Sequence, residues 1–161
     1  MSEKTYLEAE LIGSMQPGDK LTYISNAPAE TAQIAQAAAR TAKSGDVFCL
    51  DGNLGAGKTF FSQAFGAALG ITEPIVSPTF TIVSEYDGGR LPMYHFDVYR
   101  IEEIEEMDEI GFEEYVYGAG VTLIEWACRI DEVLPQHRYA VNLTRSNPQN
   151  DSERRIEICR Y

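Results

Sequence analysis

The apolar residues of this chain fall into short runs separated by glycine- and proline-containing turns. Continuous apolar runs of a few residues predict strands that are buried on both faces of a sheet, whereas spacings of three and four predict amphipathic helices. The two patterns alternate along the chain, which indicates an α/β fold. The predicted strands are residues 21–25, 47–50, 91–98, 121–126, 139–144, 155–159 and one within 77–86. The predicted helices are residues 29–43, 58–69 and 101–117, with a short one after residue 126.

The turn at Asp87-Gly88-Gly89 predicts a hairpin between the strand that ends at Tyr86 and the strand that begins at Leu91. Such a pair is antiparallel, so we expect a mixed sheet. Residues 5–11 show a weak alternation, which favours an edge strand or an added tail within residues 1–20. Because no repeat or linker interrupts the pattern, we expect a single domain over residues 1–161.

The net charge of −12 disfavours a protein that binds nucleic acid through its overall electrostatic field. Residues 101–117 contain eight acidic residues and no lysine or arginine. This segment is either a solvated helical face or a docking surface for a basic partner.

The cysteines Cys49, Cys128 and Cys159 are widely spaced and form no C-x-x-C motif, which favours a reducing cytosol over a disulfide framework or a zinc site. No apolar run approaches the roughly 18 residues of a membrane span. Residues 1–4 lack the layout of a secretory leader. We therefore expect a cytoplasmic protein with no membrane contact.

Residues 52–59 connect the predicted strand 47–50 to the predicted helix 58–69 and match G-x-x-x-x-G-K-[ST]. The glycines let backbone N–H groups converge on phosphate oxygens at a helix N-terminus. Lys58 would reach the outer phosphates, and the hydroxyl of Thr59 would hold Mg²⁺. An incidental glycine-rich turn is the alternative, which the strand before and the helix after disfavour. The predicted nucleotide-binding residues are Gly52, Asn53, Leu54, Gly55, Ala56, Gly57, Lys58 and Thr59.

Hydrolysis of a nucleotide also needs a carboxylate near the metal and a group that orients water. Glu125 and Asp97 each follow an apolar run at the end of a predicted strand. Spacing alone does not decide which acid binds the metal and which orients the water. The alternative for each acid is a structural role, in which it caps a strand or pairs locally. Thr79, on the loop after Pro78, is a candidate switch threonine or an ordinary turn residue.

Four other residues receive structural interpretations. A lone histidine beside a strand aspartate is more often structural, which favours a packing role for His95. Trp126 is better suited to the core than to stacking on a base. Arg154 and Arg155 could approach phosphate or tRNA, but we expect them to pair at the surface with Glu153 and Glu157.

Four stretches together resemble the TsaE family, bacterial P-loop ATPases that support synthesis of threonylcarbamoyladenosine in tRNA. They are Gly52–Thr59, Ser77-Pro78-Thr79-Phe80-Thr81, His95-Phe96-Asp97-Val98-Tyr99-Arg100 and Leu123-Ile124-Glu125-Trp126. The resemblance runs from about Thr31 to Ile158. It implies a three-layer α/β/α P-loop fold with a mixed sheet.

The resemblance also implies roles for individual residues. It places Mg²⁺ on Thr59 and Glu125, makes Asp97 the Walker-B-like acid, puts Thr79 in a switch-like loop and brings Thr31 near the nucleotide. The catalytic set is then Lys58, Asp97 and Thr79, and the cofactors are ATP and Mg²⁺.

The family partners would be TsaD and TsaB, with ATP hydrolysis resetting the synthase and tRNA contacted only indirectly. Asn53 and Phe60 replace the usual aspartate and second threonine of the family, and neither change removes a phosphate donor or a metal ligand. Ala127 stands where the family commonly has proline. Two alternatives stay open: a small-molecule P-loop kinase, and a binding module that a nucleotide regulates with little turnover.

Overall fold

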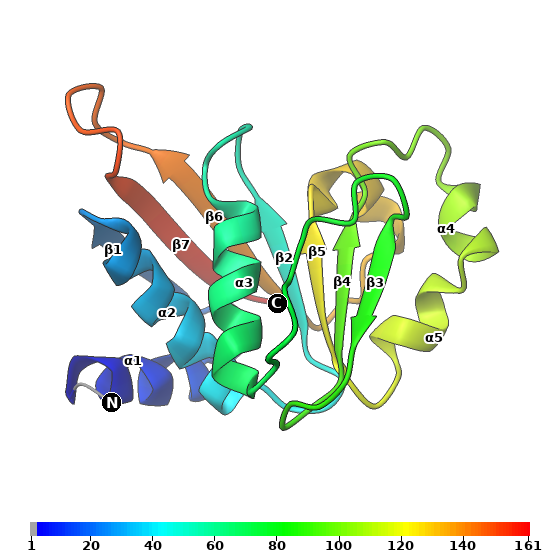
Figure 1. The fold of residues 1–161 in the computed structure, drawn as a ribbon, viewed down its shortest axis with the longest axis horizontal. Helices are drawn as coiled ribbons and strands as arrows, with labels where there is room; N and C mark the ends of the chain where they lie inside the picture. The colour runs from blue at the N-terminus through cyan, green and yellow to red at the C-terminus, as the bar shows by residue number, and fades with distance from the viewer. Residues whose placement is uncertain (1–2) are drawn as a thin grey trace.

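The computed structural model describes the backbone of residues 3–161 and the side chains from residue 8 onward. One seven-stranded sheet, in the order β1-β7-β6-β2-β5-β4-β3, forms its centre (Figure 1). The strands are β1 (Lys20–Ser25), β2 (Val47–Asp51), β3 (Val83–Tyr86), β4 (Met93–Asp97), β5 (Val121–Glu125), β6 (Tyr139–Arg145) and β7 (Arg154–Arg160). The helices are α1 (Glu3–Gly13), α2 (Pro28–Thr41), α3 (Lys58–Leu69), α4 (Glu105–Glu109), α5 (Phe112–Val116) and the 3₁₀ segment η1 (Ala127–Val133).

The centre of the sheet is parallel and both of its margins are antiparallel. Strands β6, β2, β5 and β4 run in the same direction. β3 pairs antiparallel with β4 at one margin, and β7 and β1 extend the other margin in antiparallel pairings. The predicted hairpin and the predicted mixed sheet are therefore confirmed. Because the central strands are parallel, their carboxyl ends meet along one edge, where ligands bind in open α/β sheets.

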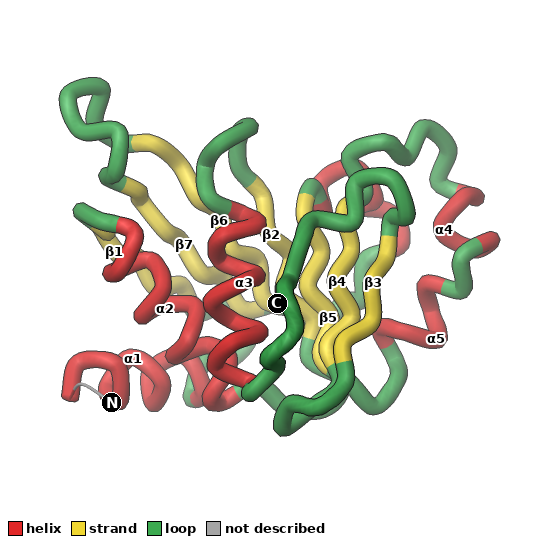
Figure 2. Tube along the Cα trace, viewed as in Figure 1, coloured by secondary structure: helices red, strands yellow, loops and turns green. Residues whose placement is uncertain are grey.

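Helices cover both faces of the sheet (Figure 2). On one face α1, α2 and α3 enclose a core in which Phe48, Phe61 and Phe65 are at most 1% exposed. On the other face α4, α5 and η1 pack over β4 and β5, and the rings of Phe96 and Phe112 meet edge to face at 5.4 Å. The three-layer α/β/α prediction is confirmed.

The prediction for the N-terminal segment was wrong, because residues 5–11 belong to helix α1 and not to an edge strand. The buried residues Ala9 and Ile12 are three positions apart within α1, which is a helical spacing, and Met15, just beyond the helix, is also buried. α1 lies against α2 so closely that a Cβ on Gly13 would sit 2.9 Å from Thr41 Cγ2. The segment is a packed part of the fold.

Other boundaries also differ from the predictions, and three of them coincide with a residue at positive φ. The acidic segment forms two short helices instead of one, because Gly111 adopts φ 72° between them. Strand β3 begins only at Val83, after Ile82 at φ 69°, and β5 ends at Glu125 because Trp126 adopts φ 63°. Among residues 3–161, no helix is long and apolar enough to span a membrane.

Candidate active site

The glycine-rich loop leaves the end of β2 and enters α3 in a conformation that its glycines make possible. Gly52 adopts φ 154°, and a Cβ there would lie 2.4 Å from the backbone oxygen of Leu143. Gly57 adopts φ 109° directly before the first turn of α3. The N-terminus of a helix carries partial positive charge and unpaired N–H groups. The loop thus brings such an end to the edge of the sheet.

Lys58 folds back over the loop. Its Nζ donates to the backbone oxygen of Gly52 and, at 3.0 Å, to that of Asn53, and it lies 4.0 Å from the ring centroid of Trp126. An ammonium group has three N–H donors, so one is left for a ligand after these two contacts. Burial lowers the pKa of Lys58, while the nearby carboxylates, first of all Glu125, favour its charged form.

Thr59 and Glu125 form a pair of oxygen ligands. The hydroxyl of Thr59 donates to Glu125 Oε1 at 2.7 Å, and Glu125 is 2% exposed. Within residues 3–161, no group of three or more His, Cys, Asp or Glu side chains is arranged to enclose a metal. Mg²⁺ is commonly held by one or two protein oxygens and completes its shell with water and substrate phosphates. The donor set of Thr59 and Glu125 therefore fits Mg²⁺.

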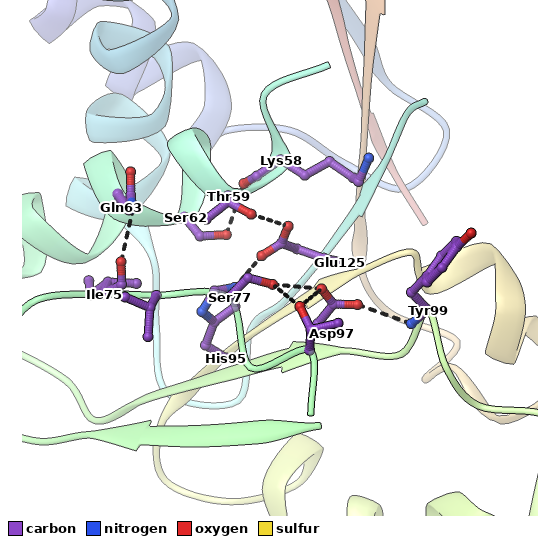
Figure 3. Close-up of polar contacts among 12 residues, drawn as sticks. Lys58, Thr59, Ser62, Gln63, Ile75, Ser77, His95, Asp97, Tyr99 and Glu125 are labelled. Carbon is purple, nitrogen blue, oxygen red and sulfur yellow. Dashed lines mark hydrogen bonds and ion pairs between the residues drawn. The ribbon is translucent and has the colours of Figure 1, made fainter. Parts of the chain in front are cut away.

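Asp97 stands beside Glu125 on the neighbouring strand, where the register pairs the two residues directly. Its Oδ2 accepts from Ser77 Oγ at 2.6 Å and from Thr79 Oγ1 at 3.4 Å, and its Oδ1 accepts from the backbone N–H of Tyr99 at 3.0 Å. Figure 3 shows Asp97 turned toward Ser77 and Tyr99, while Glu125 faces Thr59. The two predicted acids thus make separate sets of contacts.

A cavity of about 320 Å³ opens over these groups. Eight residues predicted from the sequence line it together: Leu54, Gly55, Gly57, Lys58, Thr59, Thr79, Asp97 and Glu125. A second cavity, of about 310 Å³, lies on the other side of the loop and is lined by the predicted residue Thr31. The hydroxyl of Thr31 is 2.7 Å from that of Ser25. Both cavities include Gly55, Gly57 and Phe60, so they adjoin along the loop.

The remaining loop residues differ in exposure. Ala56 is 2% exposed, whereas the side chain of Leu54 is 88% exposed and Asn53 is also exposed. Lys58 and Thr59 are therefore the predicted loop residues whose side chains make the polar contacts described above.

Sequence reasoning missed the arginines behind the loop. Arg154 Nε donates to the backbone oxygen of Ala56 at 2.8 Å and Nη2 to that of Gly55 at 3.2 Å, and Arg145 also contacts the oxygen of Gly55. The expected pairing of Arg154 with the Glu153 carboxylate was wrong, because Arg154 is drawn to the loop carbonyls instead. The expected pairing of Arg155 with Glu157 is confirmed, at 2.8 Å.

Sequence reasoning also undervalued Ser77, His95 and Trp126. Ser77 binds Asp97, and Trp126 is only partly buried and lines the larger cavity instead of filling the core. His95 Nε2 lies 2.6 Å from Glu125 Oε2. Alternation along a strand puts His95 and Asp97 on one face, but only the β4–β5 pairing reveals that this face meets Glu125.

The fold and the site together define a class. A mixed α/β sheet carries a glycine-rich loop between a central parallel strand and a helix, and acids from the two neighbouring strands β5 and β4 stand in front of it. This is the architecture of α/β proteins of the P-loop type.

Comparisons with known proteins narrow the class to a family. The model of threonylcarbamoyl adenosine biosynthesis protein TsaE matches residues 25–156. The tRNA threonylcarbamoyladenosine biosynthesis protein TsaE of Bacillus subtilis (strain 168) is 50% identical over 129 residues, which are 80% of this chain and 78% of that protein. TsaE of Treponema pallidum (strain Nichols) is 42% identical over 120 residues, which are 74% and 88% of the two chains.

A solved structure agrees with this result. The crystal structure of Bacillus subtilis YdiB superimposes with a TM-score of 0.76 and 42% identity, and covers 89% of this chain and 87% of that one. The chain belongs to the TsaE family.

Proposed function

We propose that this protein is a Mg²⁺-dependent ATPase that acts in the cytoplasm as an accessory subunit in tRNA threonylcarbamoyladenosine synthesis, where hydrolysis of ATP resets a synthase of TsaB and TsaD. The contact between Thr59 and Glu125 at the end of the glycine loop is the observation that carries the ATPase part, because it joins the two sequence motifs into one metal-binding pair. Family membership supports the tRNA-modification part.

The cavities on the two sides of the loop suit a nucleoside triphosphate. Phosphates would lie against the N-terminus of α3, with Lys58 as the cation that contacts the outer phosphates. The nucleoside would extend toward the cavity that Thr31 lines. Thr59 and Glu125 would hold Mg²⁺, which neutralises charge that develops on the phosphate oxygens.

Asp97 is suited to act on the attacking water. Ser77, Thr79 and the Tyr99 N–H hold its carboxylate at the cavity wall, beside but separate from the metal pair. A carboxylate held in this way would accept a hydrogen bond from water and aim its oxygen at the terminal phosphorus. The bond to the leaving oxygen then breaks, and ATP and water become ADP and phosphate.

The apolar side chains around the site support a protein partner. Leu54 on the loop is 88% exposed and Phe80 on the segment after Thr79 is 83% exposed. Leu54 lines the larger cavity, and Phe80 directly follows Thr79, which also lines it. Exposed large apolar side chains are typical of surfaces that contact other proteins.

The kinase alternative receives no support from the segment that would form a lid. Residues 105–116 form α4 and α5, whose side chains Met107, Phe112 and Val116 are buried in the core on the sheet face opposite α3. A binding module with little turnover differs from the proposal only in rate.

Phosphate release tests this proposal. We expect slow release from ATP by the protein alone and faster release when TsaB and TsaD are added. Lys58→Ala should reduce the rate by about 10²-fold or more, because the cation that meets the phosphates is lost. Asp97→Ala should slow turnover while ATP still binds. Lys43→Ala, at an exposed lysine, is the matched control and should leave the rate unchanged. Rapid transfer of phosphate to a small metabolite, with no response to TsaB and TsaD, would contradict the proposal.

A further inference from the structure

The carboxylate of Glu125 is held by two side chains from different elements. Thr59, on α3, donates to Oε1, and His95, on β4, lies with Nε2 2.6 Å from Oε2 (Figure 3). His95 is 0% exposed and the Glu125 side chain is 2% exposed, so water does not compete for the contact. Both carboxylate oxygens are therefore fixed before any ligand arrives.

The sheet makes the position of His95 rigid. β4 lies between β3 and β5, and His95 pairs with Ser84 on one side and with Leu123 on the other. Glu125 follows Leu123 by two residues on β5, so its side chain emerges on the same face as that of His95. Diagonal neighbours on one face lie within reach of long side chains. The backbone register of two central strands thus sets the distance from His95 to Glu125.

The surroundings of the His95 ring indicate which of its two nitrogens carries the hydrogen. His95 Nδ1 is buried and has no hydrogen-bond partner among the side chains and backbone that the structure describes. A neutral ring can hydrogen-bond the carboxylate only by donating from Nε2, which leaves Nδ1 as the acceptor. We therefore assign the Nε2–H tautomer. Such a ring orients Glu125 and leaves the negative charge of the carboxylate for a cation.

We propose that His95 is a positioning residue that holds the Glu125 carboxylate in the orientation that receives Mg²⁺. This inference rests on the proposed function, because it assumes that Glu125 binds the metal. Its physical basis is general: groups that hydrogen-bond a metal ligand fix its orientation, and removing them typically weakens metal binding by about 10- to 100-fold. His95 touches neither ATP nor the attacking water and acts only through Glu125.

The test is the gain in ATP affinity that Mg²⁺ gives, measured as the ratio of the dissociation constants in EDTA and in Mg²⁺. We expect His95→Leu to reduce this ratio by about 10-fold and to leave the affinity in EDTA within about twofold of wild type. His95→Gln, whose amide nitrogen can donate from nearly the position of Nε2, should recover most of the ratio. His137→Gln, at the exposed histidine, is the matched control and should behave as wild type.

The outcomes separate this inference from the proposed function. A folded His95→Leu variant with the wild-type ratio overturns the positioning role alone, as does a His95→Gln variant that is as deficient as His95→Leu. A wild-type protein whose ATP affinity ignores Mg²⁺ overturns both the positioning role and the metal site. If His95→Leu does not fold, His95→Gln is compared with His95→Asn instead. The shorter asparagine side chain does not reach Glu125, so His95→Asn should show a reduced ratio of the dissociation constants while His95→Gln keeps it, and equal ratios would overturn the positioning role.

Discussion

At the scale of single residues, Arg154 and Arg155 show that identical, adjacent side chains make different contacts because of their positions in the fold. Successive residues of a strand point to opposite faces. Arg154 reaches the loop and donates to the carbonyls of Gly55 and Ala56, whereas Arg155 pairs with Glu157. The C=O and N–H on a trans peptide point in opposite directions, so holding the Ala56 oxygen turns the N–H of Gly57 away from Arg154. Arg154 thereby sets the direction of a loop N–H.

Replacing these arginines tests that division. We expect Arg154→Ala to lower the free energy of unfolding by about 1–3 kcal/mol, because two loop carbonyls lose a charged donor. The same variant should bind ATP more weakly. Arg155→Ala, one residue away, loses only an exposed ion pair and should change stability by about 0.5 kcal/mol or less. Urea unfolding and ATP titration measure both effects, and equal behaviour of the two variants would show that Arg154 does not support the loop.

How well a site residue could be predicted depends on whether its chemistry is local. The residues Gly52, Gly57, Lys58 and Thr59 follow one another along a single loop, so their spacing alone reveals them. His95 and Arg154 matter because strands far apart in the sequence bring them to Glu125 and to the loop. No spacing rule along the chain encodes such contacts.

At the scale of elements, prediction succeeded where burial imposes a pattern. The central strands β2 and β5 are apolar runs because both of their faces are covered, and their boundaries agree with the prediction to within one residue. A larger error arose where one backbone angle divides an element, as at Gly111, which separates α4 from α5. In α1 the buried residues Ala9 and Ile12 are three positions apart, and Ile12 lies just outside the window 5–11 that shows the alternation.

Helix α1 offers a test of its own role. Ile12 is 0% exposed, whereas the adjacent Leu11 is 51% exposed. We expect Ile12→Ala to reduce the free energy of unfolding by about 2–4 kcal/mol, since it leaves a cavity in the core. Leu11→Ala removes the same kind of side chain from the surface and should cost about 0.5 kcal/mol or less. Chemical denaturation of the two variants is the measurement, and a stability of Ile12→Ala equal to wild type would mean that α1 is not part of the core.

At the scale of the whole molecule, the sheet order explains how distant motifs meet. β2 ends at the glycine loop, β5 ends at Glu125 and β4 ends at Asp97, and these parallel strands are neighbours. One edge of the sheet therefore collects the loop and both acids. β6 and β7 bring Arg145 and Arg154 to the same loop from its other side. The fold surrounds the loop with cations behind and carboxylates in front.

The charge of the whole chain agrees with a role through protein partners. With a net charge of −12, the protein offers no general field that attracts nucleic acid. Acidic residues concentrate on the segment of α4 and α5, away from the arginines beside the loop. In the proposed function, contact with tRNA is left to the partners.

The central claim is that Lys58, Thr59 and Glu125 form a site for Mg²⁺ and ATP, and calorimetric titration of ATP in Mg²⁺ and in EDTA tests it most directly. We predict that wild-type protein binds ATP in both conditions and about tenfold or more tightly with Mg²⁺, a difference of roughly 1.4 kcal/mol. Glu125→Ala should lose the gain from Mg²⁺ and keep the affinity in EDTA, whereas the exposed-acid control Glu132→Ala should match wild type. Absence of ATP binding, or an undiminished gain from Mg²⁺ in Glu125→Ala, would contradict the account.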